Sequence, residues 1–153
     1  MNADENLESK NADKIRILPL VAALVAIAGM IDAIYLTVKH YTGEKVPCSV
    51  TGGCETVLSS EYSEIGGIPL ALFGALAYFT VFSLATLAAF GDDRMWKILS
   101  VVVALMAVFS LWLLYLQAFV IGAFCQFCLL SAGTTFTLLL LVIIRQFLPK
   151  KLS

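Results

Sequence analysis

Phe124-Cys125-Gln126-Phe127-Cys128 opens the last long apolar segment of a chain of 153 residues. Two cysteines three residues apart at the start of a helix share one face, so their thiols can form a disulfide or cycle through one. The free N–H groups and the dipole of a first helical turn also stabilise a thiolate. We expect this effect to be stronger at Cys125, and we expect Cys128 to be more deeply buried. The alternative is a pair of unreactive cysteines in an apolar core.

The composition is that of a membrane protein. Hydrophobic residues make up 60% of the chain and charged residues 14%, and the mean hydropathy is +0.92. Soluble domains carry about 25% charged residues, so the deficit indicates contact with lipid. The net charge of −1 carries no information on nucleic acid. No basic patch with interleaved aromatic residues occurs, and we expect no such partner.

Four apolar segments are long enough to cross a bilayer core of about 30 Å as helices. The predicted fold class is therefore an all-α membrane protein, a bundle of four transmembrane helices in one domain of residues 15–148. The predicted spans are residues 15–38, 67–90, 96–121 and 124–147. Pro19 would lie in the first turns of the first span, where a missing N–H is tolerated.

The polar segments lie between and outside these spans. Residues 1–14 are predicted to be a disordered cytoplasmic tail, and residues 149–153 a second tail. Residues 39–66 form the only long hydrophilic connection. We expect this loop to hold a short amphipathic helix, between Glu55 and Tyr62, at the membrane surface.

The basic residues predict the orientation, because cytoplasmic loops carry the excess of lysine and arginine. The other side carries only Lys39 and Lys45. The side with the excess holds Lys10, Lys14, Arg16, Arg94, Lys97, Arg145, Lys150 and Lys151. Both termini are therefore expected in the cytoplasm, and the long loop and the head of the fourth span on the outer side. All four cysteines would then share one face of the membrane.

Cys48 and Cys54 form a second close pair, in the long loop. A bridge between them would gain about 2.4 kcal/mol of loop entropy, against about 4.5 kcal/mol for a bridge from the loop to the fourth helix. A disulfide between two such close cysteines stabilises the fold little and suits a site of thiol–disulfide exchange. A purely structural disulfide is the alternative. A four-cysteine zinc site is disfavoured, because C-x5-C is not the usual ligand spacing, and we expect no metal. Our hypothesis is one electron relay through the four thiols.

Two further groups are candidates to handle protons. Asp32 lies in the outer half of the first span, where an acid usually faces the bundle interior and has a functional role. Hydrogen bonding between helices is the alternative for Asp32. His40, the sole histidine, follows the same span and also suits an interfacial anchor.

With these features the chain resembles the bacterial, single-domain form of the vitamin K epoxide reductase family, over about residues 15–147. The motifs are G-x-x-D-x-x-Y-L-T-x-x-H at 29–40, the C-x5-C pair, G-I-P-L-A-L-F-G at 67–74 and C-Q-F-C at 125–128. The resemblance implies a four-helix bundle around a quinone, capped by the loop helix. The quinone could be of the ubiquinone, menaquinone or vitamin K type. It also implies the inner membrane of a bacterium, with the cysteines on the periplasmic or extracellular side.

The resemblance also implies roles for the cysteines. Cys128 would contact the quinone with Cys125 as its disulfide partner. Cys48 and Cys54 would be the shuttle pair, with Cys54 favoured to exchange with Cys125. The implied activity is oxidation of a thioredoxin-fold, DsbA-like protein at the expense of the quinone, in support of disulfide bond formation. No fused thioredoxin-like domain follows in this sequence, so we expect the partner to be a separate protein.

Further positions come from the same resemblance. Ser60, Leu70 and Phe73 would lie at the quinone. The vertebrate enzymes place an asparagine and a tyrosine on the vitamin K ring where this chain has Leu70 and Ala132. This difference favours plain quinone reduction over epoxide reduction.

Three other interpretations stay open. One is a vitamin K quinone or epoxide reductase proper, and another is a disulfide-stapled membrane scaffold without activity. The third is the unrelated bacterial disulfide oxidase with four helices and four cysteines. That protein carries its C-x-x-C after the first helix, and the reversed order here argues against it.

Overall fold

The computed structural model describes residues 2–148. The elements, in chain order, are α1 (Asn2–Thr42), α2 (Cys54–Leu58), the 3-10 turn η1 (Glu61–Ser63), β1 (Glu64–Ile65), β2 (Ile68–Pro69), α3 (Leu70–Ala89), α4 (Asp93–Tyr115), the π-helical turn η2 (Leu116–Ile121) and α5 (Gln126–Phe147). Four segments of the described chain are long and apolar enough to cross a membrane: Asn2–Thr42, Leu70–Ala89, Asp93–Ile121 and Gln126–Phe147. The predicted all-α bundle of four membrane helices is confirmed.

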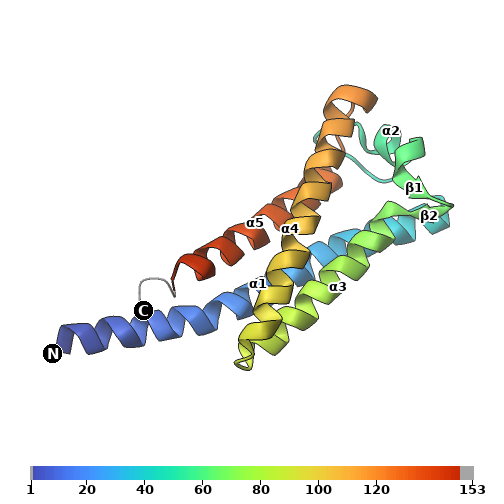
Figure 1. Ribbon diagram of the computed structural model, residues 1–153. Helices are drawn as coiled ribbons and strands as arrows, with labels where there is room; N and C mark the ends of the chain where they lie inside the picture. Colours follow the sequence, from blue (N-terminus) through green and yellow to red (C-terminus); the bar gives the residue numbers. More distant parts are fainter. Residues whose placement is uncertain (1, 149–153) are drawn as a thin grey trace.

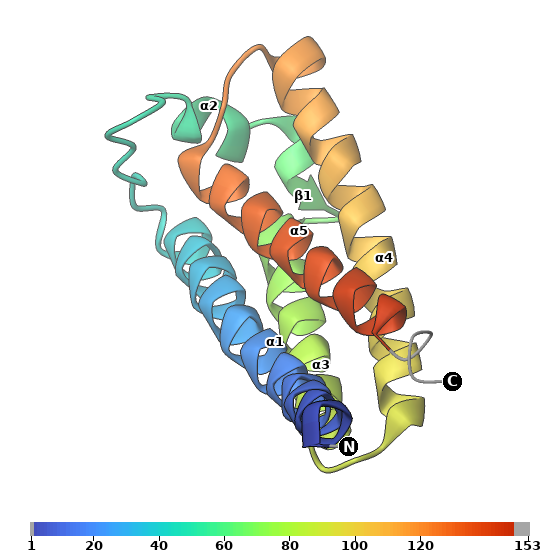
Figure 2. The same cartoon turned by 90° about the vertical axis from the view of Figure 1, so that its left-hand side faces the viewer.

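The long helices lie alongside one another, and the short elements gather at one end of the bundle (Figure 1). α1 packs against α3 and α5, and α4 packs against the same two helices from the other side (Figure 2). α2 and the β1–β2 hairpin cover the end at which α1 finishes and α5 begins. We call this the loop end of the bundle. The tail predicted at 149–153, with Lys150 and Lys151, lies outside the described residues.

α1 is longer than predicted, because residues 2–14 continue it as a helix. The expectation of a disordered tail is therefore wrong. Once a helix has nucleated, each further residue adds a hydrogen bond at little cost, and neither glycine nor proline interrupts this segment. As a result Pro19 lies inside the helix rather than in its first turns.

Small side chains bring α1 and α3 together. One core cluster contains buried alanines from both helices: Ala22, Ala23, Ala26 and Ala33 from α1, and Ala75, Ala85 and Ala88 from α3. Small residues let helix backbones approach closely in a membrane. Gly29 lies at the tightest point, since an added Cβ would be 2.5 Å from the ring of Tyr78. The first glycine of the 29–40 motif therefore makes room for a buried tyrosine.

The opposite end of the bundle is held by a charged cluster between α4 and α5. The side chain of Asp92 caps α4 by accepting a hydrogen bond from the N–H of Arg94 at 3.0 Å. Arg145, near the end of α5, is buried and donates to Asp93 at 3.1 Å. Its guanidinium group lies 4.3 Å from the ring centroid of Trp96. A buried cation thus has both an anion and an aromatic face as partners.

The loop end differs from the prediction in its boundaries. The helix expected from Glu55 to Tyr62 is shorter, because α2 ends at Leu58 and η1 follows. Gly66 and Gly67 both have positive φ angles, 62° and 82°, as a two-residue hairpin turn of type I′ requires. This turn joins β1 to β2 and delays the start of α3 to Leu70.

The approach to α5 is also irregular. α4 ends in the π-helical turn η2, and Gly122 then adopts the left-handed conformation with φ 69°. Residues 123–125 are not helical, so α5 begins at Gln126 rather than Phe124. π-Helical turns occur frequently at functional sites. This one brings the C-x-x-C segment back beside the end of α4.

Candidate functional site

The structure brings the four cysteines together at the loop end. Cys54 and Cys125 are fully buried in one small apolar cluster, and Cys48 and Cys128 pack against it. Cys48 and Cys54 form a disulfide with a Cα–Cα distance of 5.8 Å. Cys125 and Cys128 are free thiols; Cys125 is the buried one and Cys128 is partly exposed. The expectation that Cys128 is the more deeply buried is therefore wrong, because Cys125 is packed in the cluster with Cys54. Two pairs that are more than 70 residues apart in the chain therefore share one site.

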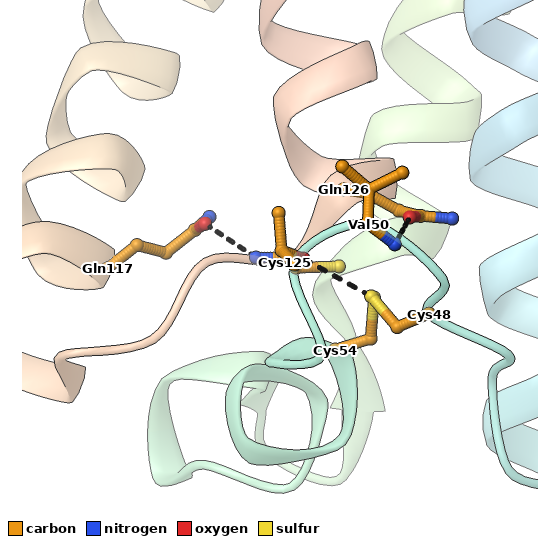
Figure 3. The surroundings of a disulfide bond; sticks show 7 residues. Cys48, Val50, Cys54, Gln117, Cys125 and Gln126 are labelled. Atoms are coloured by element: carbon orange, nitrogen blue, oxygen red, sulfur yellow. Dashed lines mark hydrogen bonds between the residues drawn. A yellow bond between two sulfur atoms is a disulfide. The ribbon is translucent and has the colours of Figure 1, made fainter.

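Two contacts hold the loop against the start of α5 and the residues just before it. A Cβ added to Gly53 would lie 2.6 Å from the carbonyl oxygen of Phe124, so only glycine allows this approach. The N–H of Val50 donates to Oε1 of Gln126 at 3.1 Å. Figure 3 shows the outcome: the side chain of Cys125 points toward the Cys54 end of the disulfide. The loop thus presents one of its two sulfurs to the C-x-x-C pair.

Cys125 occupies the N-cap position of α5, just before the apolar span, with an extended backbone (φ −97°, ψ 120°). A hydrogen bond from the thiol of Cys128 lowers the pKa of the Cys125 thiol below its usual value, and the backbone N–H groups of Cys128 and Phe127 act in the same direction. Burial opposes them. The pKa of Cys125 is thus shifted in the direction that the sequence predicts, with the hydrogen bond from Cys128 as the largest cause.

The backbone of Cys125 is held by a residue that the sequence analysis missed. Its N–H donates to Oε1 of Gln117 at 3.2 Å (Figure 3). Gln117 lies in η2 and is 3% exposed. A polar residue in a continuous apolar run was the available signal, but the path of residues 122–125 could not be predicted from it.

A cavity of about 740 Å³ lies in the bundle below the loop. Cys128 is part of its wall, whereas Cys125 and the disulfide are not. All the positions singled out for a quinone or for protons contribute to the same wall: Asp32, His40, Ser60, Leu70 and Phe73. The structure therefore brings together every candidate from the sequence at one connected site, with Cys128 between the cavity and Cys125.

Most of the cavity wall is apolar, but a few polar groups interrupt it. Oδ2 of Asp32 is buried and has no hydrogen-bond partner among residues 2–148. The hydroxyl of Tyr78 donates to the carbonyl oxygen of Ser131 at 2.7 Å and lies 2.9 Å from Oγ1 of Thr135. The sequence analysis did not single out this hydroxyl cluster. An apolar cavity with a few convergent polar groups is typical of a site for a small organic ligand.

The polar residues at the mouth of the cavity have partners of their own. Nε2 of His40 lies 3.3 Å from Oε1 of Glu64, which ties the end of α1 to β1. The hydroxyl of Ser60 donates to the carbonyl oxygen of Val57 at 2.6 Å. Leu70 and Ala132, the positions at which the resemblance predicts a difference from the vertebrate enzymes, both line the cavity. The wall is therefore apolar at both of those positions.

Comparison with known proteins agrees with this geometry. The family model described as "Vitamin K epoxide reductase family" matches residues 20–143. The chain belongs to this family. A curated relative, the thiol-disulfide oxidoreductase LTO1 of Arabidopsis thaliana, is 29% identical over 123 residues. The match covers 73% of the chain but 32% of the relative, so the chain spans about a third of that protein's length.

Proposed function

We propose that the protein oxidises a thioredoxin-fold thiol protein through Cys48 and Cys54 and passes the electrons through Cys125 and Cys128 to a quinone. One observation carries the proposal: Cys125 faces the loop disulfide, while its neighbour Cys128 lines the cavity. Electrons could thus cross from an aqueous partner to a membrane ligand by two thiol–disulfide exchanges.

The cavity fits a quinone ring. Its volume and apolar walls suit an aromatic ligand, and the unpaired carboxyl oxygen of Asp32 offers a partner for a ring oxygen. Ser60, Leu70, Phe73 and Cys128 would hold the ring. A bound quinone would supply an acceptor for two electrons and two protons. The side chains of Leu70 and Ala132 give no hydrogen bond to an epoxide, so we favour plain quinone reduction over epoxide reduction.

The exchange steps balance without any other reactant. A thiolate of the reduced partner attacks the Cys48–Cys54 disulfide, and a second partner thiol resolves the mixed disulfide and leaves a loop dithiol. The thiolate of Cys54 then attacks Sγ of Cys125 in a Cys125–Cys128 disulfide and releases the thiolate of Cys128. Cys48 displaces Cys125 and restores the loop disulfide. This last state, with a loop disulfide and two inner thiols, has the sulfur arrangement of the structure.

Regeneration of the Cys125–Cys128 disulfide releases two electrons and two protons on the cavity side. Cys128 would act at the ring, because its side chain borders the cavity. Asp32 would handle a proton there, since its Oδ2 has no other partner. His40 would have a lesser role, because Glu64 already engages its ring.

The orientation and location follow as part of the proposal. The excess of lysine and arginine at the ends opposite the loop supports cytoplasmic termini. The loop end would then face the periplasm or the cell exterior, across the inner membrane of a bacterium. Disulfide chemistry requires an oxidising compartment of this kind. The thiol partner would be a separate DsbA-like protein.

The test is anaerobic reduction of a quinone by the protein in detergent, with a reduced thioredoxin-fold protein as the electron donor. Cys128→Ala and Cys54→Ala should each reduce turnover to background, and Cys54→Ala should still bind the quinone. Thr137→Val, on an exposed face of α5, is the control and should keep full turnover. Absence of turnover in the unmodified protein with every quinone tested, and disulfides that resist mild reductant, would favour the scaffold interpretation.

A further inference from the structure

The peptide segment that carries Cys125 has little regular structure to hold it. It follows the left-handed Gly122 and precedes the first turn of α5. As the N-cap residue, Cys125 has an N–H outside the hydrogen-bond ladder of the helix. Its side chain is 0% exposed, so water does not replace a missing partner. The position of this sulfur therefore depends on whichever group accepts that N–H.

Gln117 is that acceptor. The bond from the N–H of Cys125 to its Oε1 joins residues eight positions apart across the turn. Both ends of the bond are buried, and buried hydrogen bonds are the costly ones to leave unmade. The same glutamine side chain also lines the cavity below Cys128. One residue therefore contacts the C-x-x-C backbone and the ligand cavity.

The π-helical turn explains how Gln117 reaches this place. It contains Gln117 and widens the end of α4 immediately before the chain reverses at Gly122. The neighbouring Phe119 is 77% exposed on the same turn, so the turn has a polar contact inward and an apolar surface outward. A regular α-helix through these residues would present the side chains in a different angular order.

We infer that Gln117 is a positioning residue for the thiol exchange, which fixes the sulfur of Cys125 between the loop disulfide and Cys128. The inference rests on the proposed function, because it assigns Gln117 to the step in which Cys54 attacks Cys125. Gln117 acts through the backbone of Cys125 and takes no part in the bond changes. Without its acceptor, the N-cap segment loses its fixed distance from Cys54, and the exchange slows.

The test compares three variants of the full chain in detergent. Gln117→Met removes the acceptor at similar length, Gln117→Glu keeps an acceptor oxygen, and Phe119→Leu changes the lipid-facing side of the same turn. The measurement is the rate at which Cys54 and Cys125 form a disulfide under a fixed concentration of a small disulfide oxidant, when Cys48 and Cys128 are both replaced by alanine. Steady-state kcat and KM for the quinone, and the unfolding temperature, are measured with the four cysteines present.

Gln117→Met should slow formation of the Cys54–Cys125 bond and lower kcat by about tenfold, the scale of one buried hydrogen bond. KM for the quinone should change less than twofold. Gln117→Glu should recover most of both rates, and Phe119→Leu should match the parent protein. Equal rates for Gln117→Met and the parent would overturn the inference, as would a Gln117→Glu variant no faster than Gln117→Met. If no Cys54–Cys125 bond forms even with Gln117 present, the proposed relay itself fails.

Discussion

The interface between α1 and α3 and the loop end of the bundle differ in how tightly they are packed. Along the interface between α1 and α3, which we call the seam, buried alanines line both helices and the ring of Tyr78 lies against Gly29. The loop between α1 and α3 is seated by the close approach of Gly53, one long-range hydrogen bond from Val50 and a local disulfide. The helices at the seam therefore have little freedom to move, whereas the loop can leave its position by breaking few contacts.

This difference matches the two tasks of a thiol relay. A ligand cavity needs fixed walls, and close packing of helices supplies them. A shuttle pair must meet a partner outside and Cys125 inside, so its loop must move between at least two positions. The contrast therefore predicts that substitutions in the seam act on stability, while substitutions in the loop act on exchange rates.

Gly29→Ala should break the seam and have the largest effect on stability. Its Cβ would lie 2.5 Å from the ring of Tyr78, and overpacking of this kind costs about 1–3 kcal/mol. The unfolding temperature in detergent should fall by several degrees. Gly133→Ala is the matched control, because a Cβ there meets nothing within 4 Å. An equal effect of both substitutions would show that the seam is not tightly packed.

Gly53→Ala should slow thiol–disulfide exchange and leave stability nearly unchanged, the reverse of Gly29→Ala. The new Cβ would lie 2.6 Å from the carbonyl oxygen of Phe124, so the loop must shift away from Cys125. The exchange between the loop pair and the inner pair should slow by about tenfold, as expected for a loss near 1.4 kcal/mol. The unfolding temperature should change little. Single-turnover kinetics of inner-pair reduction measure the rate, and an unchanged rate would contradict the role of this contact.

Gln126→Leu tests the same contrast between the loop and the seam, and we expect a smaller effect, confined to the loop. The substitution removes the acceptor for the N–H of Val50, which is an exposed contact, and a bond of this kind contributes about 0.5–1.5 kcal/mol. Amide hydrogen exchange at residues 49–53 should accelerate about threefold to tenfold, while exchange in α3 stays constant. Faster exchange in both regions would mean that the loop is not an independent unit.

The pH dependence of alkylation tests the state of Cys125. The hydrogen bond from Cys128 and the N–H groups at the start of α5 lower the pKa of the Cys125 thiol. Its alkylation rate should therefore rise with pH and level off below the value of about 8.5 for an ordinary cysteine. In Cys128→Ala the midpoint should move to higher pH, because the first of these bonds is lost. A midpoint that does not move would remove Cys128 as the cause.

The sequence predicted the bundle, because apolar length sufficed for the four spans. The four cysteines and Asp32 were singled out from their positions, and Ser60, Leu70 and Phe73 from the family resemblance; their roles stay predictions. These features depend on composition and on local order.

The missed features depend on the path of irregular backbone. Gln117 acquires its role from a π-helical turn and a left-handed glycine, neither of which has a periodic signal. Tyr78 finds its hydroxyl partners on α5, more than 50 residues away. The helix over residues 2–14 reflects propagation from a nucleated span, which local polarity does not show.

The most direct test of the relay is to identify the disulfide that forms when one cysteine of each pair is removed. Cys48→Ala with Cys128→Ala leaves Cys54 and Cys125, while Cys54→Ala with Cys128→Ala leaves Cys48 and Cys125. After mild oxidation, peptide mapping by mass spectrometry should find a Cys54–Cys125 bond within a single chain in most of the first variant. The second variant should form little Cys48–Cys125 bond. Equal bonding in both variants, or bonds only between chains, would contradict an exchange from Cys54 to Cys125.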